Sequence, residues 1–157
     1  MKLLQQQYEL IKSSREVLLD YCAGLSPEQL ITPVPAFNNS SVRHLLVHIS
    51  NTYQSWLGNF AMNKNYPFPK TEEVNRLEEI IKQFDEANNT VEEFLNRFDP
   101  EEKISGIATF KKIPMTATAL HLFTHAITHE FHHKGQILSM TRHFGFVPVD
   151  TDALRFG

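Results

Sequence analysis

Four long segments of this chain repeat their apolar residues every three or four positions, and this spacing limits the possible fold more than any other feature. Successive residues of an α-helix turn by about 100°, so such a repeat places the apolar side chains on one face. Each helix can then bury one stripe against the others. We therefore expect an all-α protein, a four-helix bundle, with helices at residues 3–23, 40–60, 71–95 and 116–143.

Residues that favour helix ends and loops separate these four segments. The proline-rich stretches 31–39 and 63–69 predict loops, and residues 26–29 predict only a short helical turn. Residues 104–113 are interpreted as a short extended hairpin. The predicted helix caps are Gly24, Asn39 or Ser40, Thr71 and Gly145.

The composition is that of one globular domain, which we expect to cover residues 1–157. A chain of 157 residues with 41% hydrophobic and 21% charged residues suits a single core. Its formal charge of -3 provides no basic surface for phosphates, so we expect no nucleic-acid partner. We find no signal peptide and no stretch of membrane-spanning length, which predicts no membrane association. Cys22 is the single cysteine and cannot form an internal disulfide, so we expect a cytoplasmic protein.

Residues 121–133 hold five of the eight histidines, and four of these five stand four positions apart. The four are His121, His125, His129 and His133. Side chains at this spacing lie one turn apart on the same face, so His129 and His133 can bind one metal ion. A single histidine is more often a surface or hydrogen-bonded residue, but a ladder of histidines among apolar neighbours favours a metal site. At least one further ligand must come from elsewhere in the chain.

The same residues also match a protease motif, which fails for lack of a third ligand. Residues 129–133 fit the His-Glu-x-x-His pattern of zinc metalloproteases, with Glu130 as general base. One class of these enzymes needs glycine and histidine where this chain has Gln136 and Ser139. Another class uses a later glutamate, and Glu130 is the last glutamate of the chain. We therefore reject a protease.

The best candidate for the third ligand is His48, and His44 one turn earlier is the alternative. His48 lies in the middle of the second predicted helix, from which it can project toward the fourth. A metal site of His48, His129 and His133 between helices two and four would leave coordination positions open, as in catalytic centres. Neutral imidazoles leave the charge of the ion uncompensated, so the ion can acidify water or a thiol.

Two histidine motifs and the C-terminal stretch also form a recognisable set. Residues 41–49, Ser-Val-Arg-His-Leu-Leu-Val-His-Ile, precede Trp56 by several positions. Residues 125–136 place three histidines four positions apart before Lys-Gly-Gln, and residues 142–152 read Arg-His-Phe-Gly-Phe-Val-Pro-Val-Asp-Thr-Asp. In these three stretches the chain resembles the DinB family, the DinB/YfiT-like group of metalloenzymes.

The resemblance implies a four-helix bundle with a divalent metal, often zinc or nickel, at His48, His129 and His133. His125 matches a frequent family histidine that is not a usual ligand, so we expect it behind the ligands or in the pocket wall. Gln136 is expected to orient a group in the pocket. Lys134 stands where arginine is common in the family, and lysine lacks the bidentate geometry of arginine.

The resemblance also implies a function, because the wider group includes transferases that use low-molecular-weight thiols such as bacillithiol or mycothiol. Our leading hypothesis is thiol-dependent S-transfer, in which the metal lowers the pKa of the thiol and the thiolate attacks an electrophilic small-molecule substrate. One alternative is a hydrolase that uses water activated by the metal. Another is a non-catalytic stress protein that binds a metal or a small ligand; a homodimer is possible in each case. Glu130 is the candidate base, but it lies about 100° around the helix from His129, where it could face solvent instead.

Overall fold

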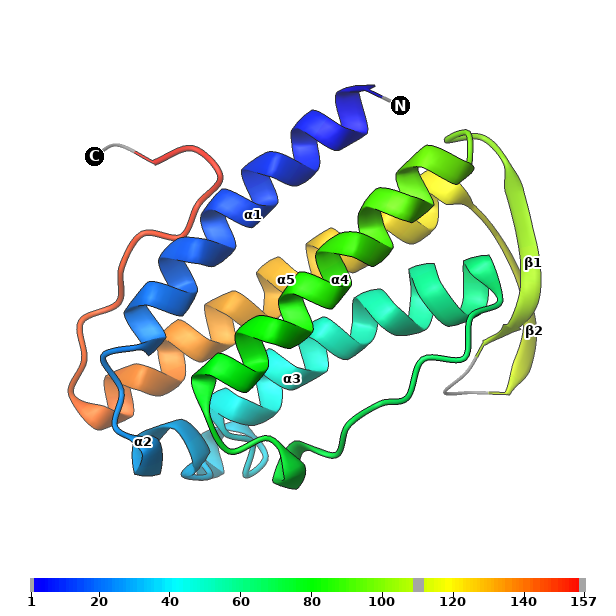
Figure 1. Cartoon of the computed structure of the whole chain (residues 1–157). Helices are drawn as coiled ribbons and strands as arrows, with labels where there is room; N and C mark the ends of the chain where they lie inside the picture. The colour runs from blue at the N-terminus through cyan, green and yellow to red at the C-terminus, as the bar shows by residue number, and fades with distance from the viewer. Residues whose placement is uncertain (1, 109–111, 156–157) are drawn as a thin grey trace.

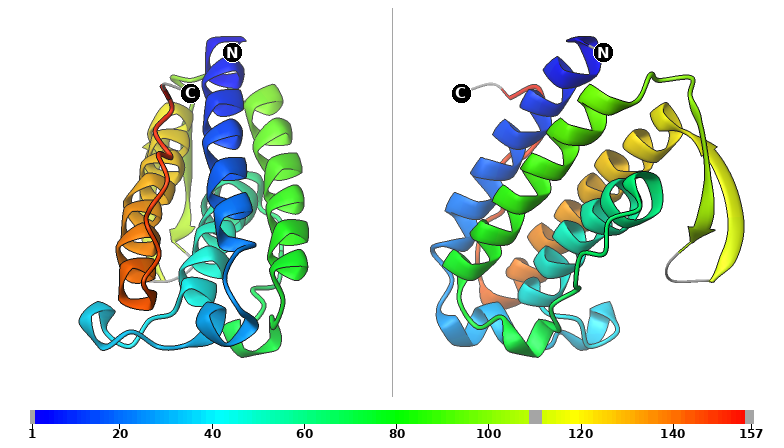
Figure 2. Two further views of the ribbon diagram at one scale, coloured as in Figure 1. Left: turned by 90° about the vertical axis from the view of Figure 1, so that its left-hand side faces the viewer. Right: turned by 45° about the vertical axis from the view of Figure 1, so that its right-hand side comes forward.

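The structure is a computed structural model that describes residues 2–108 and 112–155, and it is mostly helical (Figure 1). Strands β1 (Lys103–Ala108) and β2 (Ile113–Thr118) form an antiparallel pair at one end of the helices. The short helix α2 (Pro27–Ile31) lies at the opposite end. The long helices, which run side by side in both views of Figure 2, are α1 (Lys2–Cys22), α3 (Val42–Tyr53), α4 (Leu77–Arg97) and α5 (Ala119–Thr141).

One apolar core lies between the four long helices. Helix α3 packs against α4 and α5, and α1 packs against the same two helices. Each long helix contributes side chains from its predicted apolar stripe, and burial of one such side chain contributes roughly 1.5–3 kcal/mol. The most deeply buried of them include Leu18, Leu46, Phe94 and Phe123. The apolar spacing of the sequence therefore predicted the layout of the core.

The expected all-α class needs one correction, because a two-stranded sheet precedes α5. Lys103 pairs with Thr118 at one end of this hairpin, and Ala108 pairs with Ile113 at the other. The predicted extended hairpin is thus present, although residues 109–111 of it lie outside the described residues. The last three residues of its second strand, 116–118, occupy positions that we had assigned to the fourth helix, since threonine favours a strand there. Helix α5 begins only at Ala119, where the Thr118 hydroxyl accepts a hydrogen bond from the His121 N–H.

The start of α4 also differs from the prediction. We expected a helix from Thr71, but Thr71–Glu73 is a single 3-10 turn and α4 begins at Leu77. The Glu79 carboxylate accepts hydrogen bonds from the backbone N–H groups of Asn75 and Arg76. A glutamate at the third helical position stabilises a helix start in this way. Residues 74–76 therefore connect the 3-10 turn to α4, and the hydrogen bonds of Glu79 stabilise the start of α4 at Leu77.

Helix α3 does not end at Tyr53 but continues as a π-helical segment, Gln54–Ala61. Such segments are rare and often lie beside functional sites. Here the segment carries Trp56 toward α5, and it also contacts β1. The π-helical segment therefore contacts both α5, which carries five of the histidines, and the hairpin.

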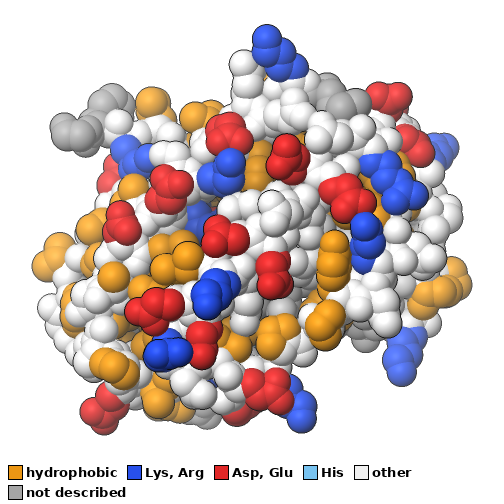
Figure 3. Space-filling model, viewed as in Figure 1, with side chains coloured by type: hydrophobic (Ala, Val, Ile, Leu, Met, Phe, Trp, Pro, Cys, Tyr) orange, Lys and Arg blue, Asp and Glu red, His pale blue; other side chains and the backbone are white. Residues whose placement is uncertain are grey.

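The surface shows no strong separation of charge on the face drawn in Figure 3. Acidic and basic side chains are interspersed there, with apolar side chains between them. In the described ranges, no helix has both the length and the apolar character needed to cross a bilayer.

Candidate metal centre

Three histidines bring ring nitrogens together between α3 and α5. His48 projects from α3, and His129 and His133 project from consecutive turns of α5. The His129 Nε2 atom lies 2.9 Å from His48 Nε2 and 3.0 Å from His133 Nε2. One nitrogen from each ring lies within 4.8 Å of the other two. Within residues 2–108 and 112–155, this is the one cluster of three or more side chains with a metal-binding arrangement.

Two of the three separations between these nitrogens fit a shared divalent cation. Nitrogens bound to one ion at roughly 2.0–2.1 Å stand about 2.9–3.4 Å from each other, depending on the coordination angle. The contacts of His129 at 2.9 and 3.0 Å match the short end of that range. Lone pairs at such distances repel unless a proton or a cation lies between them. A single cation would satisfy all three nitrogens at once.

Gln136 fixes the protonation state of one candidate ligand. Its Oε1 atom lies 2.7 Å from the Nδ1 atom of His133. Because an amide oxygen can only accept, this contact places the ring proton on Nδ1 and leaves the lone pair of Nε2 directed at the cluster. A second hydrogen-bonding partner of this kind commonly orients a metal-binding imidazole. Gln136 thus lies where the sequence predicted an orienting residue.

All three rings are held neutral. Burial, followed by the neighbouring imidazoles His133 and His44, lowers the pKa of His48 to about 4. Burial, followed by the neighbouring imidazoles His133 and His48, lowers the pKa of His129 to about 4. Burial also lowers the pKa of His133. A metal needs a deprotonated imidazole. The centre is therefore ready to bind a cation at neutral pH without first releasing protons.

His125 lies behind His129 and forms part of a pocket wall. Its ring centre is 5.6 Å from that of His129 and 5.3 Å from that of Trp56. A small pocket of about 110 Å³ begins at this point, and its other walls come from α5 and from β2. The residues that line the pocket are Trp56, Met115, Ala117, His121, Leu122 and His125. Two of the four ladder histidines thus line an adjacent, mainly apolar pocket.

The alternative ligand His44 lies one turn before His48 and outside the cluster. The two rings stack at 6.4 Å, and the His44 side chain is exposed. Its Nδ1 atom is 3.4 Å from the Thr71 hydroxyl. His44 therefore borders the centre on its exposed side.

We expected Glu130 to be either a catalytic base or a residue that faces solvent. The second expectation is wrong, because Glu130 is 1% exposed. The Arg15 guanidinium binds both oxygens of its carboxylate, with Nε at 3.0 Å and Nη2 at 2.7 Å. The Tyr53 hydroxyl donates a third hydrogen bond at 2.6 Å. Burial opposes ionisation of Glu130, but Arg15 outweighs it and keeps the pKa of this carboxyl below its usual range. The carboxylate is thus fully engaged in the core.

Lys134 belongs to the same buried group of charges. Its ammonium lies 3.4 Å from Glu130 and donates a hydrogen bond to the Ser14 hydroxyl at 2.6 Å. Burial lowers the pKa of Lys134 to about 8, against the opposing effect of Glu130. Ser14 in turn donates to the backbone carbonyl of Thr151, so the network also holds the C-terminal segment against α1. We call Arg15, Glu130 and Lys134 the buried charge network.

Sequence reasoning missed the partners of Glu130, although one signal was present. Arg15 stands in the apolar stripe of α1, between Ile11 and Leu18. A lone arginine in such a stripe must find a buried acceptor or leave the core. The acceptor could not be named from the sequence, because Glu130 lies 115 positions away.

The sequence comparison now decides the family. The family model of the DinB family matches residues 1–157. The chain belongs to the DinB family. The resemblance seen in the two histidine motifs is thereby confirmed, and no protein of the curated set matches the chain. Family membership and the three-histidine cluster are compatible with a metal-binding DinB protein.

Proposed function

We propose that this DinB protein is a metal-dependent enzyme built as a four-helix bundle, in which His48, His129 and His133 hold a divalent ion, zinc or nickel. The observation that carries the proposal is the convergence of three neutral ring nitrogens at 2.9–3.0 Å around His129. Three protein ligands leave room for a substrate atom, as in catalytic rather than structural zinc sites. Structural sites normally close the coordination shell with a fourth side chain.

We propose thiol-dependent S-transfer as the reaction. A divalent ion held by His48, His129 and His133 would act as a Lewis acid and favour the ionised form of a thiol beside it. The S–C bond then forms as the electrophile loses its leaving group, and the thiol proton passes to solvent. The protein's own Cys22 does not serve as the nucleophile in this scheme, because burial raises the pKa of its thiol to about 12. The thiol must therefore be a separate small molecule.

The residues of the DinB protein have distinct parts in this scheme. Gln136 holds the proton of His133 away from the centre, which keeps Nε2 available. The apolar pocket beside His125 and Trp56 would hold the carbon body of the electrophile next to the reacting sulfur. Glu130 is assigned to the buried charge network rather than to proton transfer, since Arg15 and Tyr53 occupy its oxygens.

A hydrolase remains the second candidate, because the same neutral ligands would activate water as well as a thiol. The adjacent apolar pocket would hold the carbon body of either substrate, so assays must separate the two reactions. A non-catalytic metal-binding protein is the third candidate. The homodimer and the cytoplasmic location stay predictions.

Metal analysis and a thiol assay test this proposal together. Protein purified without a histidine tag is loaded with Zn²⁺ or Ni²⁺, dialysed, and its metal content is measured. We expect one ion per chain, and consumption of a chlorodinitrobenzene electrophile that requires an added low-molecular-weight thiol. His48→Ala should lose both properties, and His132→Ala should keep both.

Three outcomes separate the candidates. Absence of bound metal under every loading condition excludes all metal-based functions. Bound metal with thiol-independent ester hydrolysis identifies the hydrolase. Bound metal without turnover of any tested electrophile or ester identifies the binding protein.

A further inference from the structure

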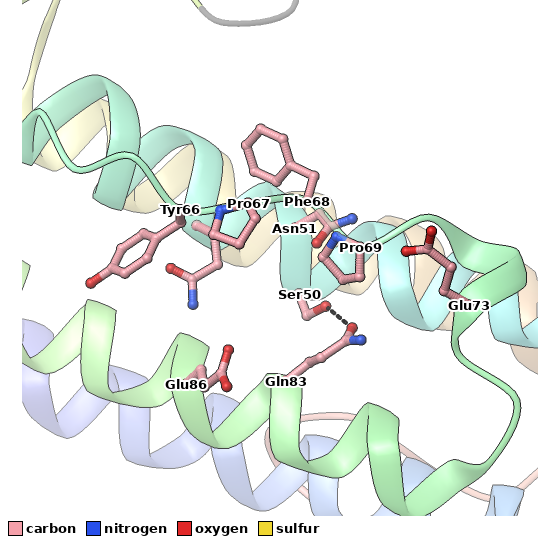
Figure 4. A pocket seen from close by; sticks show the side chains of 10 residues that line it. Ser50, Asn51, Tyr66, Pro67, Phe68, Pro69, Glu73, Gln83 and Glu86 are labelled. Atoms are coloured by element: carbon pink, nitrogen blue, oxygen red, sulfur yellow. Dashed lines mark hydrogen bonds between the residues drawn. The ribbon is translucent and has the colours of Figure 1, made fainter.

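A second cavity lies in the angle between α3, α4 and the loop of residues 63–70. Its volume is about 460 Å³, within the range of roughly 300–1,000 Å³ that is usual for small-molecule sites. Ser50 lines this cavity, and it lies about 200° around α3 from His48. The cavity, whose lining side chains are drawn in Figure 4, therefore lies on another side of α3 from His48.

Two carboxylates line this cavity, and its lining contains no lysine or arginine. Glu86 comes from α4, and Glu73 comes from the 3-10 turn before α4. Among the residues that the structure describes, neither carboxylate forms an ion pair with a basic side chain. Glu73 accepts a single hydrogen bond, from the backbone N–H of Lys70. Two negative charges that lack a cationic partner favour a cationic ligand.

The aromatic wall of the cavity is fixed in place by the π-helical segment. Asn59 makes two hydrogen bonds to the backbone of Tyr66, donating to its carbonyl at 3.1 Å and accepting from its N–H at 2.8 Å. The ring of Tyr66 occupies the space above Gly58, where a Cβ atom would approach the ring to 2.6 Å. Phe68 also borders the cavity, but its ring points away from Gln83 and Glu86 (Figure 4), so the aromatic wall is the ring of Tyr66. Aromatic faces attract organic cations, so this wall suits the same ligand as the carboxylates.

Two amide side chains add hydrogen-bond donors with a defined orientation. The Gln54 Oε1 atom accepts a hydrogen bond from the Thr90 hydroxyl at 2.8 Å. This contact leaves the amide nitrogen as the free end, and within the described residues that nitrogen has no hydrogen-bond partner. Gln54 is 8% exposed and lines the cavity, so this donor is available to water or to a ligand that enters the cavity. Gln83 is oriented in the same way, because its Oε1 atom accepts from Ser50 at 3.1 Å (Figure 4).

We propose that this cavity binds a small organic ammonium compound that also carries a hydroxyl or carbonyl oxygen. The ammonium group lies beside Glu86, on the side of the cavity where Tyr66 stands (Figure 4), and Glu73 adds negative charge at the other end. The oxygen accepts a hydrogen bond from the Gln54 amide. The two carboxylates disfavour an anion, and a bare metal ion would use neither the Gln54 amide donor nor the ring of Tyr66.

Three phenyl compounds of matched shape test the proposal. The probe is 2-amino-1-phenylethanol, which carries both groups, and the comparisons are 2-phenylethylamine without the hydroxyl and 1-phenyl-1,2-ethanediol without the ammonium. Binding is followed by NMR through the side-chain amide signals of Gln54 and Gln83. We expect the amino alcohol to bind in the millimolar range, roughly -4 kcal/mol, and the diol to bind at least tenfold more weakly.

Substitutions separate this cavity from the rest of the protein. Glu86→Gln should weaken binding of the amino alcohol about tenfold, because Glu86 is exposed and its replacement leaves the fold intact. Glu93→Gln is the matched control: this glutamate lies on the same helix but pairs with Lys64 outside the cavity lining, and binding should not change. His48→Ala should leave binding unchanged, which shows that the cavity acts independently of the metal centre.

Several results would overturn the proposal. They are equal binding of the diol and the amino alcohol, unchanged binding in Glu86→Gln, or no shift of the Gln54 signal with any probe. A titration with Mg²⁺ that reproduces the shifts, while the amines cause none, would identify an inorganic cation site instead.

Discussion

Two pairs of residues stand next to each other on α5 and have opposite surroundings. His129 and His133 form one pair at a spacing of four, and Glu130 and Lys134 form another pair one position later. A helix rotates by about 100° over that one position. The first pair meets His48 at a partly open centre, whereas Glu130 and Lys134 are each 1% exposed and meet Arg15 and Ser14 in the core.

The difference lies in how the polar atoms are satisfied. The carboxylate of Glu130 and the cations around it satisfy one another within the protein. The three imidazoles have lowered pKa values and bring their Nε2 atoms together. A single ring proton on His129 can bridge only one of its two contacts at a time, whereas a cation would serve both. The same four-residue spacing thus produces a charged structural network on one face and an incomplete centre on the next. We therefore expect substitutions in the two pairs to affect different properties.

Glu130→Gln should have the largest effect, and it should be on stability. The substitution leaves Arg15 and Lys134 buried without a negative partner, and breaking a buried ion pair costs roughly 3–5 kcal/mol. The measurement is the free energy of unfolding in urea. Glu9→Gln, which breaks an exposed pair with Lys12, is the control and should cost under about 1 kcal/mol.

The same network gives a pH dependence. Arg15 holds the pKa of Glu130 below its usual value despite burial. The stability from this group is therefore fully present above the unfolded pKa near 4.5 and is lost as the pH falls through the lower folded value. If Glu130 instead acts as a catalytic base, Glu130→Gln will keep its stability and lose turnover alone.

His48→Ala should have the reverse profile, with a small effect on stability and a large one on metal binding. Loss of a residue that only hydrogen-bonds a metal-binding histidine weakens metal binding roughly 10–100-fold. Loss of His48, which would bind the metal directly, should weaken it more. The unfolding free energy of the metal-free protein should change by about 1 kcal/mol or less, because the ring is only half-buried. Competition with a chromogenic chelator measures the affinity. Equal metal affinity in His48→Ala and the unsubstituted protein would contradict the site.

The two regions also differ in how far the sequence predicted them. His129 and His133 could be paired because helical spacing is local, and the motif around His48 supplied the partner on α3. The three-histidine cluster was therefore predicted in outline, with only its distances missing, and metal binding by it stays a prediction. The long helices could be predicted from their apolar stripes, because this spacing is also local in the sequence.

The buried charge network could not be predicted, because its members come from helices whose relative rotation the sequence does not specify. Arg15 and Glu130 meet across the core, 115 positions apart. The start of α5 was also misplaced, since residues 113–118 are stabilised as a strand by pairing with β1 rather than by local helical spacing. Local periodicity thus predicts which side chains share one face of a helix. Contacts between residues far apart in the sequence decide what that face packs against.

Gln136→Leu should have a smaller effect on metal binding than His48→Ala. Leucine keeps the size of the side chain but removes the oxygen that accepts the His133 Nδ1 proton at 2.7 Å. The ring can then change its tautomer, and we expect metal affinity to fall roughly 10–100-fold. Chelator competition measures this affinity, and NMR of ¹⁵N-labelled histidine reports the tautomer of the metal-free protein. Gln136→Glu is the matched variant and should keep the tautomer, because its carboxylate also accepts this proton.

The smallest predicted effect is that of mild acid on metal binding. An imidazole with an ordinary pKa of 6.5 is about 10% neutral at pH 5.5, whereas one with a pKa of about 4 is about 97% neutral there. His48 and His129 have pKa values of about 4. Their lowered values mean that their contribution to stability is fully present above pH 6.5 and is lost only as the pH falls toward 4. Metal affinity between pH 7 and 5.5 should therefore change by less than about tenfold, where three ordinary histidines would lose roughly a thousandfold. A steep loss of metal affinity between pH 7 and 5.5 would show that the fold does not hold the rings neutral. The pair His129 and His133 would then differ from the pair Glu130 and Lys134 only in burial.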